Sequence, residues 1–312
     1  MNIVFFGSSE FAVPSLEGLL TTKHSVSCVV TQPDKQKGRG LHVEATFVKA
    51  LAIKKGLRIY QPQRINTEEA VEFLKDLKPD LFVVIAYGQI LSSKVLSIPG
   101  IFAINAHASN LPKLKGAAPI NWAIINGEKN TGVTIIKMTE KMDAGPIIGH
   151  KTVEIKEDDD ALSLEEKLSR IAKDLLLQAL AAIENNNYTL TQQDEKKATF
   201  APKLKKEDGL IYWHKSARDI SNLIRGCLNW PGACTHYKGK ILKIYKAKVF
   251  QPPPVTPQSS PGSVTQVNKD GIIVATGKDS LIIQELQLEG RRKMESSEFI
   301  LGHKIEAGQI LK

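Results

Sequence analysis

Residues 80–86 read Asp80-Leu81-Phe82-Val83-Val84-Ile85-Ala86, and this run decides the fold class of the chain. Six successive apolar residues without polar alternation are typical of a strand buried on both faces, as in a parallel sheet. Runs of the same kind at 2–7 and 26–31 precede it, and segments with helical spacing, such as 43–55 and 67–77, lie between the runs. This alternation predicts an α/β domain whose parallel sheet has right-handed crossovers.

In a parallel sheet the ligand binds beyond the carboxyl ends of the strands. These ends lie at residues 7–9, 31–34, 87–89 and 105–107. The first turn has one glycine, Gly7, where a dinucleotide-binding loop needs three, and the chain has no G-x-x-x-x-G-K-[ST] loop. Both observations disfavour NAD, FAD and nucleoside triphosphates as ligands.

The last of these ends carries Asn105, His107 and Ser109 at alternate positions. Alternation at period two places them on one face, if the strand continues that far. For an Asn-x-His pair considered alone, polar residues that cap a sheet are the more common explanation.

Asp143 is a third polar group that could join this strand end. It lies in the turn Met142-Asp143-Ala144-Gly145-Pro146, and we expect a parallel sheet to bring this turn beside Asn105 and His107. An amide donor, an imidazole and a carboxylate suit acyl transfer to an amine, in which donors stabilise an oxyanion. No Ser or Cys lies in a nucleophile elbow, so we expect no covalent intermediate. The alternatives are that Asp143 only forms the turn and that His107 is an interior histidine with satisfied hydrogen bonds.

With 312 residues, 42% of them hydrophobic and 24% charged, the chain is long enough for two globular domains. We expect a first domain at 1–185, a polar, lysine-rich linker at 186–208 and a second domain at 209–312. Short β-type runs between residues 235 and 288 predict that the second domain is a small barrel or sandwich.

The excess of positive charge lies in the second domain. Residues 205–312 carry 17 Lys and Arg against 10 Asp and Glu, whereas the rest of the chain carries 25 against 23. This asymmetry indicates a polyanionic partner, and the alternative is a solvated basic surface without one.

Three cysteines, Cys28, Cys227 and Cys234, are an odd number and lie far apart, which indicates a reducing compartment. No stretch is long and apolar enough to cross a bilayer, and the first residues do not form a signal peptide. We therefore expect a cytoplasmic protein without membrane contact. The spacing of His and Cys suits no metal site.

Longer motifs connect these residues to a known family. Asn105-x-His107-x-Ser109-x-Leu111-Pro112-x-x-Lys115-Gly116-Ala117-x-Pro119 is followed by Thr131-Gly132-Val133-Thr134 and Met142-Asp143-Ala144-Gly145. The whole chain resembles the formyltransferases that use 10-formyltetrahydrofolate and, among them, the bacterial methionyl-tRNA formyltransferases. The resemblance implies a Rossmann-like formyl-transfer domain with a parallel sheet, followed by a small OB-like β-barrel domain.

The resemblance also implies roles for individual residues. The catalytic Asn, His and Asp of the family match Asn105, His107 and Asp143. Its folate-binding Ser-Leu-Leu-Pro matches Ser109, Asn110, Leu111 and Pro112, with Asn110 standing where Leu is usual. The strand end formed by Ala86, Tyr87 and Gly88 is expected to line the pterin pocket.

The implied reaction transfers the formyl group of 10-formyltetrahydrofolate, a co-substrate, to the free amino group of initiator methionyl-tRNA, without a metal. We expect Asn105 and protonated His107 to stabilise the oxyanion while Asp143 orients His107 and assists proton removal. The product, N-formylmethionyl-tRNA, serves translation initiation, and the enzyme is expected to be a monomer. Formylation of an amino-sugar nucleotide and RNA binding without catalysis are the alternative functions.

The candidate tRNA contacts are basic residues. Residues 32–64 contain eight Lys and Arg against two acidic residues. The resemblance implies that a basic loop here enters the acceptor stem region, with Arg39 as the main candidate and Lys35 and Lys37 beside it. In the second domain Lys243 and Lys246 could contact phosphates, and such binding weakens with salt.

Overall fold

The computed structural model describes residues 1–37, 42–251 and 259–312. By their contacts they form two compact units. The first comprises Met1–Pro119, Asn130–Glu154 and Glu165–Pro202, and the second comprises Ile120–Lys129, Ile155–Leu164 and Lys203–Lys312. The domain boundaries inferred from the sequence, at residues 185 and 209, stay a prediction.

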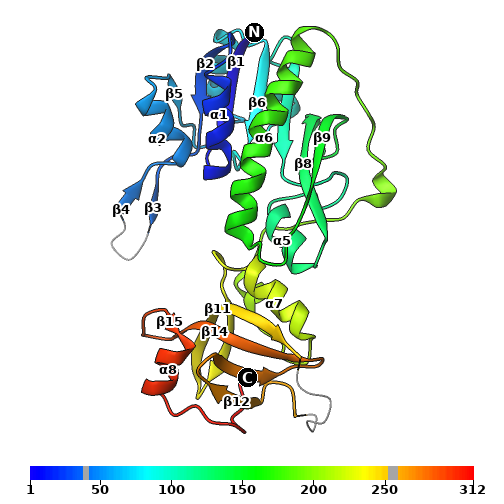
Figure 1. Cartoon of the computed structure of the whole chain (residues 1–312). Helices are drawn as coiled ribbons and strands as arrows, with labels where there is room; N and C mark the ends of the chain where they lie inside the picture. The colour runs from blue at the N-terminus through cyan, green and yellow to red at the C-terminus, as the bar shows by residue number, and fades with distance from the viewer. Residues whose placement is uncertain (38–41, 252–258) are drawn as a thin grey trace. The chain divides into compact units, whose positions relative to one another are not determined.

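The first unit is built on a seven-stranded sheet with the order β5-β2-β1-β6-β7-β8-β9 (Figure 1). Its strands are β1 (Asn2–Gly7), β2 (Ser25–Val30), β5 (Ile59–Tyr60), β6 (Leu81–Ile85), β7 (Phe102–His107), β8 (Asn130–Lys137) and β9 (Ile147–Glu154). From β5 to β7 neighbouring strands are parallel, whereas β8 is antiparallel to both β7 and β9. The predicted α/β class is confirmed, and the sheet is mixed because of its last two strands.

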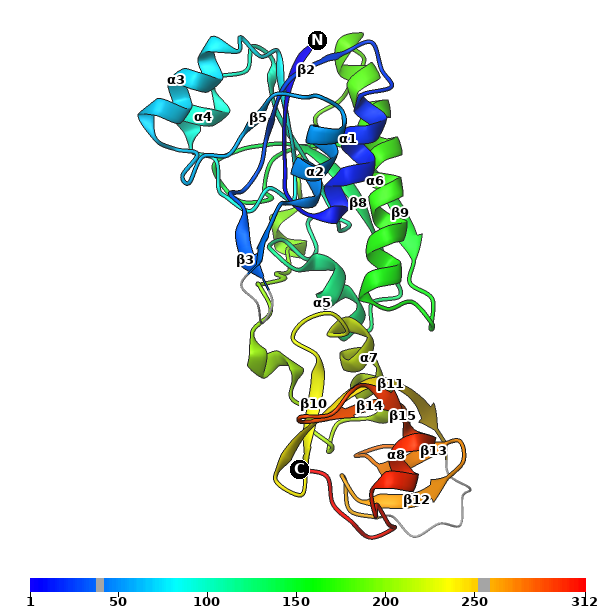
Figure 2. The same cartoon turned by 90° about the vertical axis from the view of Figure 1, so that its left-hand side faces the viewer.

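Helices cover both faces of this sheet and bury its apolar side chains. They are α1 (Val13–Leu19), α2 (Phe47–Lys54), α3 (Glu68–Asp76), α4 (Ser93–Leu96) and α6 (Ala161–Glu184), with the 3₁₀ turns η1 (Glu10–Ala12) and η2 (Glu195–Lys197). Figure 2 places α3 and α4 on one side of the sheet and α1, α2 and α6 on the other. On the α3 side, Val4 and Phe6 of β1 pack in one core cluster with Val71 and Leu74. Alternate β1 residues, such as Ile3 and Phe5, are equally buried, as expected of a strand covered on both faces.

A two-stranded hairpin, β3 (Lys35–Lys37) and β4 (His42–Glu44), lies between β2 and α2. The helix predicted from residue 43 begins at Phe47, because the Thr46 hydroxyl caps it by accepting the N–H of Lys49 at 3.1 Å. Asp34 anchors the base of the hairpin: its carboxylate accepts from Lys49 Nζ at 2.5 Å and from Gln61 Nε2 at 2.8 Å.

The second unit contains a separate antiparallel sheet with the order β10-β11-β14-β13-β12, to which β15 adds beside β14. Its strands are β10 (Ala233–Tyr237), β11 (Lys240–Phe250), β12 (Val264–Asn268), β13 (Gly271–Ala275), β14 (Ser280–Leu288) and β15 (Met294–Glu295). Its helices are α5 (Pro119–Ile125), α7 (Ala217–Gly226), α8 (Ser296–Gly302) and the 3₁₀ turn η3 (Lys206–Gly209). Trp213 and Phe299 belong to its core, and the indole of Trp213 donates to Thr235 Oγ1 at 3.0 Å. None of the helices formed by the described residues is long and apolar enough to span a bilayer.

Candidate functional site

The end of β7 places Asn105 and His107 two residues apart on one strand, with β6 on one side and β8 on the other. Asn105 pairs with Val84 of β6 and Ile136 of β8, and His107 pairs with Thr134 of β8. Because side chains alternate along a strand, both residues lie on the same face of the sheet. Asn105 is half-buried, whereas only 6% of His107 is exposed.

Both nitrogens of the His107 ring face acceptors. Nε2 lies 2.9 Å from the carbonyl oxygen of Leu114, and a carbonyl only accepts, so Nε2 carries a hydrogen and donates it. Nδ1 lies 3.6 Å from Oδ1 of Asp143, which is too long for a hydrogen bond but close enough for an ion pair with a protonated ring. The ring therefore presents its Nδ1 edge to the Asp143 carboxylate.

Asp143 lies in the turn between β8 and β9, and its side chain is 11% exposed. Its backbone adopts the left-handed conformation, with φ at +50°, which Asp tolerates better than most residues. Its Oδ2 accepts the N–H of Gly116 at 2.8 Å, so the carboxylate bridges the loop after β7 and the imidazole. The expected meeting of Asp143 and His107 is observed, but a parallel arrangement does not produce it. Since β8 runs antiparallel to β7, the turn reaches His107 by folding back.

Residues 109–112 use most of their polar groups to shape their own loop. The Ser109 hydroxyl is fully buried and donates to the carbonyl of Lys113 at 2.6 Å. The Thr134 hydroxyl donates to the Ser109 carbonyl at 2.7 Å and accepts the N–H of Leu111 at 3.2 Å. The peptide bond between Leu111 and Pro112 is cis, and the Leu111 side chain is buried.

Asn110 departs from the family motif, and its contacts explain how the chain accommodates it. Its Nδ2 donates to the carbonyl of Thr131 at 2.9 Å, and its Oδ1 accepts from the Thr152 hydroxyl at 3.2 Å. Gly132 provides the room, because a Cβ there would lie 2.1 Å from Asn110 Oδ1. The side chain thus ties the loop to β8 and β9.

The three residues after β6 differ in their exposure to solvent. Ala86 and Gly88 are exposed and have φ values of +46° and +90°. Tyr87 is buried instead: its ring packs edge-on against Phe6, with ring centres 5.4 Å apart. Its hydroxyl is buried and has no hydrogen-bond partner among the described residues, and burial raises its pKa above the usual range.

The basic residues in and near the hairpin differ in whether they have partners within the first unit. Lys35 is exposed at the start of β3, Lys37 lies at its end, and Arg39 falls outside the described residues. Lys49 forms an ion pair with Asp34, and the Arg58 guanidinium stacks over the ring of Phe73 at 4.7 Å. Lys49 and Arg58, two of the eight basic residues in the range 32–64, therefore already have partners within the first unit.

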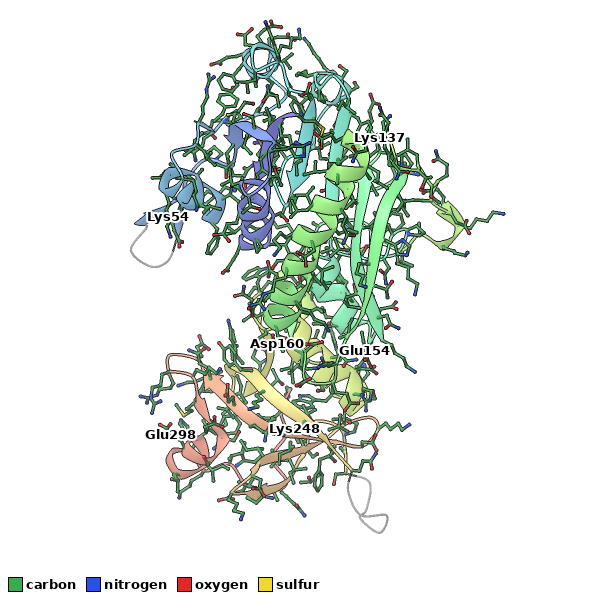
Figure 3. The ribbon with its side chains drawn as sticks, turned by 45° about the horizontal axis from the view of Figure 1, so that its top comes forward. Lys54, Lys137, Glu154, Asp160, Lys248 and Glu298 are labelled. Atoms are coloured by element: carbon green, nitrogen blue, oxygen red, sulfur yellow. The ribbon has the colours of Figure 1, made fainter. Side chains whose placement is uncertain are left out.

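Lys243, Lys246 and Lys248 of β11 share one face of the strand because the strand is irregular. Lys243 pairs with Gln287 of β14 and Lys246 with Glu285, while Tyr245 between them has no partner in the register. An extra residue of this kind is a bulge, which shifts the alternation by one position. As a result Lys246 and Lys248 are exposed, whereas Leu242 and Ile244 are buried; Lys248 is labelled in Figure 3.

Sequence patterns missed the segment 191–201, which lies in the predicted linker. Gln193 Nε2 donates to the carbonyls of Asp143 and Gly145, and Thr199 Oγ1 accepts the N–H of Leu114 at 2.9 Å. The Glu195 carboxylate accepts from Lys115 Nζ at 2.7 Å and from Lys141 Nζ at 3.1 Å. These are polar residues in a polar stretch, so no local periodicity distinguishes them.

The two tryptophans of the second unit differ in burial. As large apolar side chains, both would be expected in the core of the β-domain, but only Trp213 is buried, whereas Trp230 is 56% exposed. It lies in the turn between α7 and β10 and not on the sheet. Within the described part of the chain no group of three or more His, Cys, Asp or Glu side chains could hold a metal ion.

Comparison with family models decides the classification. A model described as "Formyl transferase" matches residues 1–180, and one described as "Formyl transferase, C-terminal domain" matches residues 203–304. The chain belongs to the formyl transferase family. The resemblance inferred from its motifs is thereby confirmed, and the two matches cover both units of this formyl transferase.

Relatives of this formyl transferase align over its full length. A methionyl-tRNA formyltransferase of Caldanaerobacter subterraneus subsp. tengcongensis is 46% identical, covering 100% of both chains. One of Acetivibrio thermocellus is 43% identical, covering 100% of this chain and 99% of the relative.

Solved structures share the fold at low sequence identity. The sugar 3N-formyl transferase WlaRD superposes with a TM-score of 0.67 at 19% identity, covering 94% of this chain and 99% of its own. HypX from Aquifex aeolicus in complex with tetrahydrofolic acid superposes with a TM-score of 0.64 at 16% identity, covering 98% of this chain and 50% of its own.

Proposed function

We propose that this formyl transferase moves the formyl group of 10-formyltetrahydrofolate to the amino group of initiator methionyl-tRNA. The observation that carries the proposal is the full-length identity of 40–46% to relatives named methionyl-tRNA formyltransferase, which extends across both units. The product, N-formylmethionyl-tRNA, serves the initiation of translation.

The catalytic roles follow from the charges that develop during acyl transfer. The α-amine of methionyl-tRNA attacks the formyl carbon, and the carbonyl oxygen gains negative charge. Asn105 Nδ2 donates to this oxygen, and such a donor typically contributes about 3–4 kcal/mol to lowering the barrier. The nitrogen–carbon bond to the folate then breaks, the proton lost by the amine is carried away, and the folate nitrogen regains a proton.

His107 and Asp143 act together on charge and proton. Nε2–H of His107 is held by the Leu114 carbonyl, so the Nδ1 edge is the part of the ring that faces Asp143 and the reacting groups. An imidazolium here stabilises the oxyanion, and the Asp143 carboxylate holds it in place and accepts the proton of the attacking amine. Since Oδ2 of Asp143 is held by Gly116, Oδ1 is the oxygen directed toward the imidazole.

The folate co-substrate would bind along the exposed backbone at Ala86 and Gly88 and the loop at 109–112. Small residues at 86 and 88 leave the backbone open to a flat heterocycle, which agrees with the chemistry of a pterin ring. Ser109 and Asn110 are engaged by their own loop and by β8 and β9, so we assign them the role of shaping the folate site. Pro112 is half-buried and provides apolar surface, and the buried Leu111 side chain contributes by anchoring the loop.

For tRNA we assign Arg39, Lys35 and Lys37 to the acceptor end, and Lys243 and Lys246 of the second unit to phosphates. Support comes from the exposure of Lys35 and Lys246 and from the excess of basic over acidic residues in 205–312. Each phosphate contact that is lost should reduce the slope of log affinity against log salt by about one.

Cellular context completes the proposal. We place the enzyme in the cytoplasm, where its substrates are used, and as a monomer. Its three cysteines are all free thiols, which agrees with a reducing compartment.

The direct experiment supplies 10-formyltetrahydrofolate with either methionyl-tRNA or an amino-sugar nucleotide and measures the formylated product. We expect formylation of methionyl-tRNA alone. Asn105→Ala should lower kcat by about 10²–10³-fold at unchanged folding, whereas Asn187→Ala, at an exposed position after α6, serves as the control. Formylation of only the sugar would support the sugar N-formyltransferase alternative, and tRNA binding without turnover would support the non-catalytic one.

A further inference from the structure

The segment 191–201 is fixed to the first unit at both ends. Thr191 and Ile147 exchange two backbone hydrogen bonds, at 2.8 and 2.9 Å. The N–H of Ala201 donates to the Lys115 carbonyl at 2.7 Å, and the Ala201 carbonyl accepts the N–H of Ala118 at 3.1 Å. The residues between these anchors therefore have defined positions beside the loop after β7 and the turn before β9.

Gln193 holds the turn that carries Asp143. Its Nε2 donates one hydrogen to the carbonyl of Asp143 at 2.9 Å and the other to the carbonyl of Gly145 at 2.7 Å. Asp143 has a left-handed backbone, and such conformations persist in non-glycine residues where surrounding contacts determine them. Two hydrogen bonds from one amide to one turn provide such contacts.

The same segment also reaches the His107 side of the pair. Thr199 Oγ1 accepts the N–H of Leu114, whose carbonyl accepts from His107 Nε2. A Cβ on Gly116 would lie 2.6 Å from the Ala201 carbonyl, so Gly116 fits against the segment only as glycine, and its N–H donates to Asp143. One stretch of chain thus contacts the supports of both the imidazole and the carboxylate.

We propose that Gln193 is a positioning residue that sets the orientation of Asp143 toward His107. The inference rests on the proposed function, because it gives Asp143 a part in formyl transfer. Gln193 itself touches no reacting atom in this assignment and acts only through Asp143. A residue 50 positions away in the sequence thereby controls the catalytic geometry.

A double-mutant cycle on formyl transfer to methionyl-tRNA tests this role. Kinetics are measured for the wild type, Gln193→Leu, Asp143→Asn and the double variant. Gln193→Leu removes both donors. We expect kcat to fall about 10- to 100-fold, because a small misplacement of a catalytic group lowers the rate by factors of this size. In the Asp143→Asn background, Gln193→Leu should lower kcat by less than about twofold, because Gln193 affects the reaction only through the Asp143 carboxylate.

The neighbouring Gln192 provides a matched control. It is exposed, and Gln192→Leu makes the same chemical change without touching the turn, so it should keep wild-type kcat. If Gln193→Leu fails to fold, Gln193→Ala replaces it in the cycle, because Ala also removes both donors and introduces no group that repels the two carbonyls.

The outcomes separate the two proposals. A folded wild type that does not formylate methionyl-tRNA overturns the proposed function. The positioning role alone is overturned if the wild type is active but Gln193→Leu leaves kcat unchanged. It is also overturned if Gln193→Leu lowers kcat by the same factor in the wild type and in Asp143→Asn.

Discussion

The ammonium group of Lys115 is buried and lies 2.7 Å from Oε1 of Glu195, a residue 80 positions later in the chain. Only 3% of the Lys115 side chain is exposed, whereas 47% of the Glu195 side chain is. Because a buried charge is costly without a partner, this pair holds the segment 191–201 against the loop after β7. Lys141 joins through the second oxygen of the same carboxylate.

Glu195→Gln should lower stability at neutral pH and leave it unchanged in acid. Hydrogen bonds from Lys115 and Lys141 hold the pKa of Glu195 below its usual 4.5. A lowered pKa in the folded state gives stability that is present above the unfolded pKa and is lost as the pH falls through the folded pKa. We therefore expect the melting temperature to drop by a few degrees at pH 7.5, with the difference from wild type shrinking below pH 4.5.

The measurement is a series of thermal melts from pH 7.5 downward. Glu17→Gln, at an exposed position on α1, serves as the control and should follow the wild-type curve at every pH. A Glu195→Gln curve parallel to wild type over the whole range would show that the pair contributes nothing through charge.

Asp143→Asn should abolish most of the activity while the protein stays folded. The amide oxygen of Asn can still accept the N–H of Gly116, but it is neutral and a poor base beside His107. We expect kcat to fall by about 10²–10⁴-fold, the range for a lost acid–base group. Steady-state kinetics with methionyl-tRNA check this, and Asp76→Asn on the exposed side of α3 is the matched control. A variant within twofold of wild type would exclude Asp143 from the chemistry.

Asn110→Leu restores the residue that is usual in the family and should nevertheless destabilise this protein. The Thr131 carbonyl loses its donor and the Thr152 hydroxyl its acceptor. We expect a loss of about 1–2 kcal/mol in the free energy of unfolding. The KM for folate should rise only modestly, because the side chain is directed at β8 and β9 and affects the folate site only through the loop that it holds.

Chemical denaturation and folate titration measure the two effects of this substitution. Thr152→Val removes only the 3.2 Å hydrogen bond to Asn110 Oδ1, and it should lower the free energy of unfolding by less than Asn110→Leu does. An Asn110→Leu variant with full stability and a raised KM for folate would instead place the side chain against the co-substrate.

The three thiols should differ in their reaction with iodoacetamide. Burial raises the pKa of Cys28 to about 11 and that of Cys227 to about 12, so both thiols stay protonated and unreactive at pH 8. Cys234 is partly exposed, and although burial raises its pKa as well, nearby Lys243 and Lys206 oppose the shift. Mass spectrometry of the native protein should show modification at Cys234 first, and urea should expose all three. Early labelling of Cys28 would contradict the buried β2 environment.

Local patterns in the sequence were sufficient to predict individual elements of the first unit. The apolar run at 80–86 contains β6, residues 2–7 form β1, and the helical segment at 67–77 contains α3. Each of these elements buries one or both of its faces, and the buried positions are occupied by apolar residues at regular spacing in the sequence. The motif around His107 and the turn at Asp143 were identified in the same way, by residue type and spacing.

Tertiary structure alone decided how these parts meet. Apolar residues of β8 have the same pattern whether the strand runs parallel or antiparallel, so its direction, and with it the route of Asp143 to His107, could not be predicted. Gln193, Glu195 and Thr199 are polar residues in a polar stretch, and their partners lie 48 to 85 residues away. Hydrogen bonds over such distances depend on the position of both groups in space, whereas a sequence pattern records only the burial of each residue.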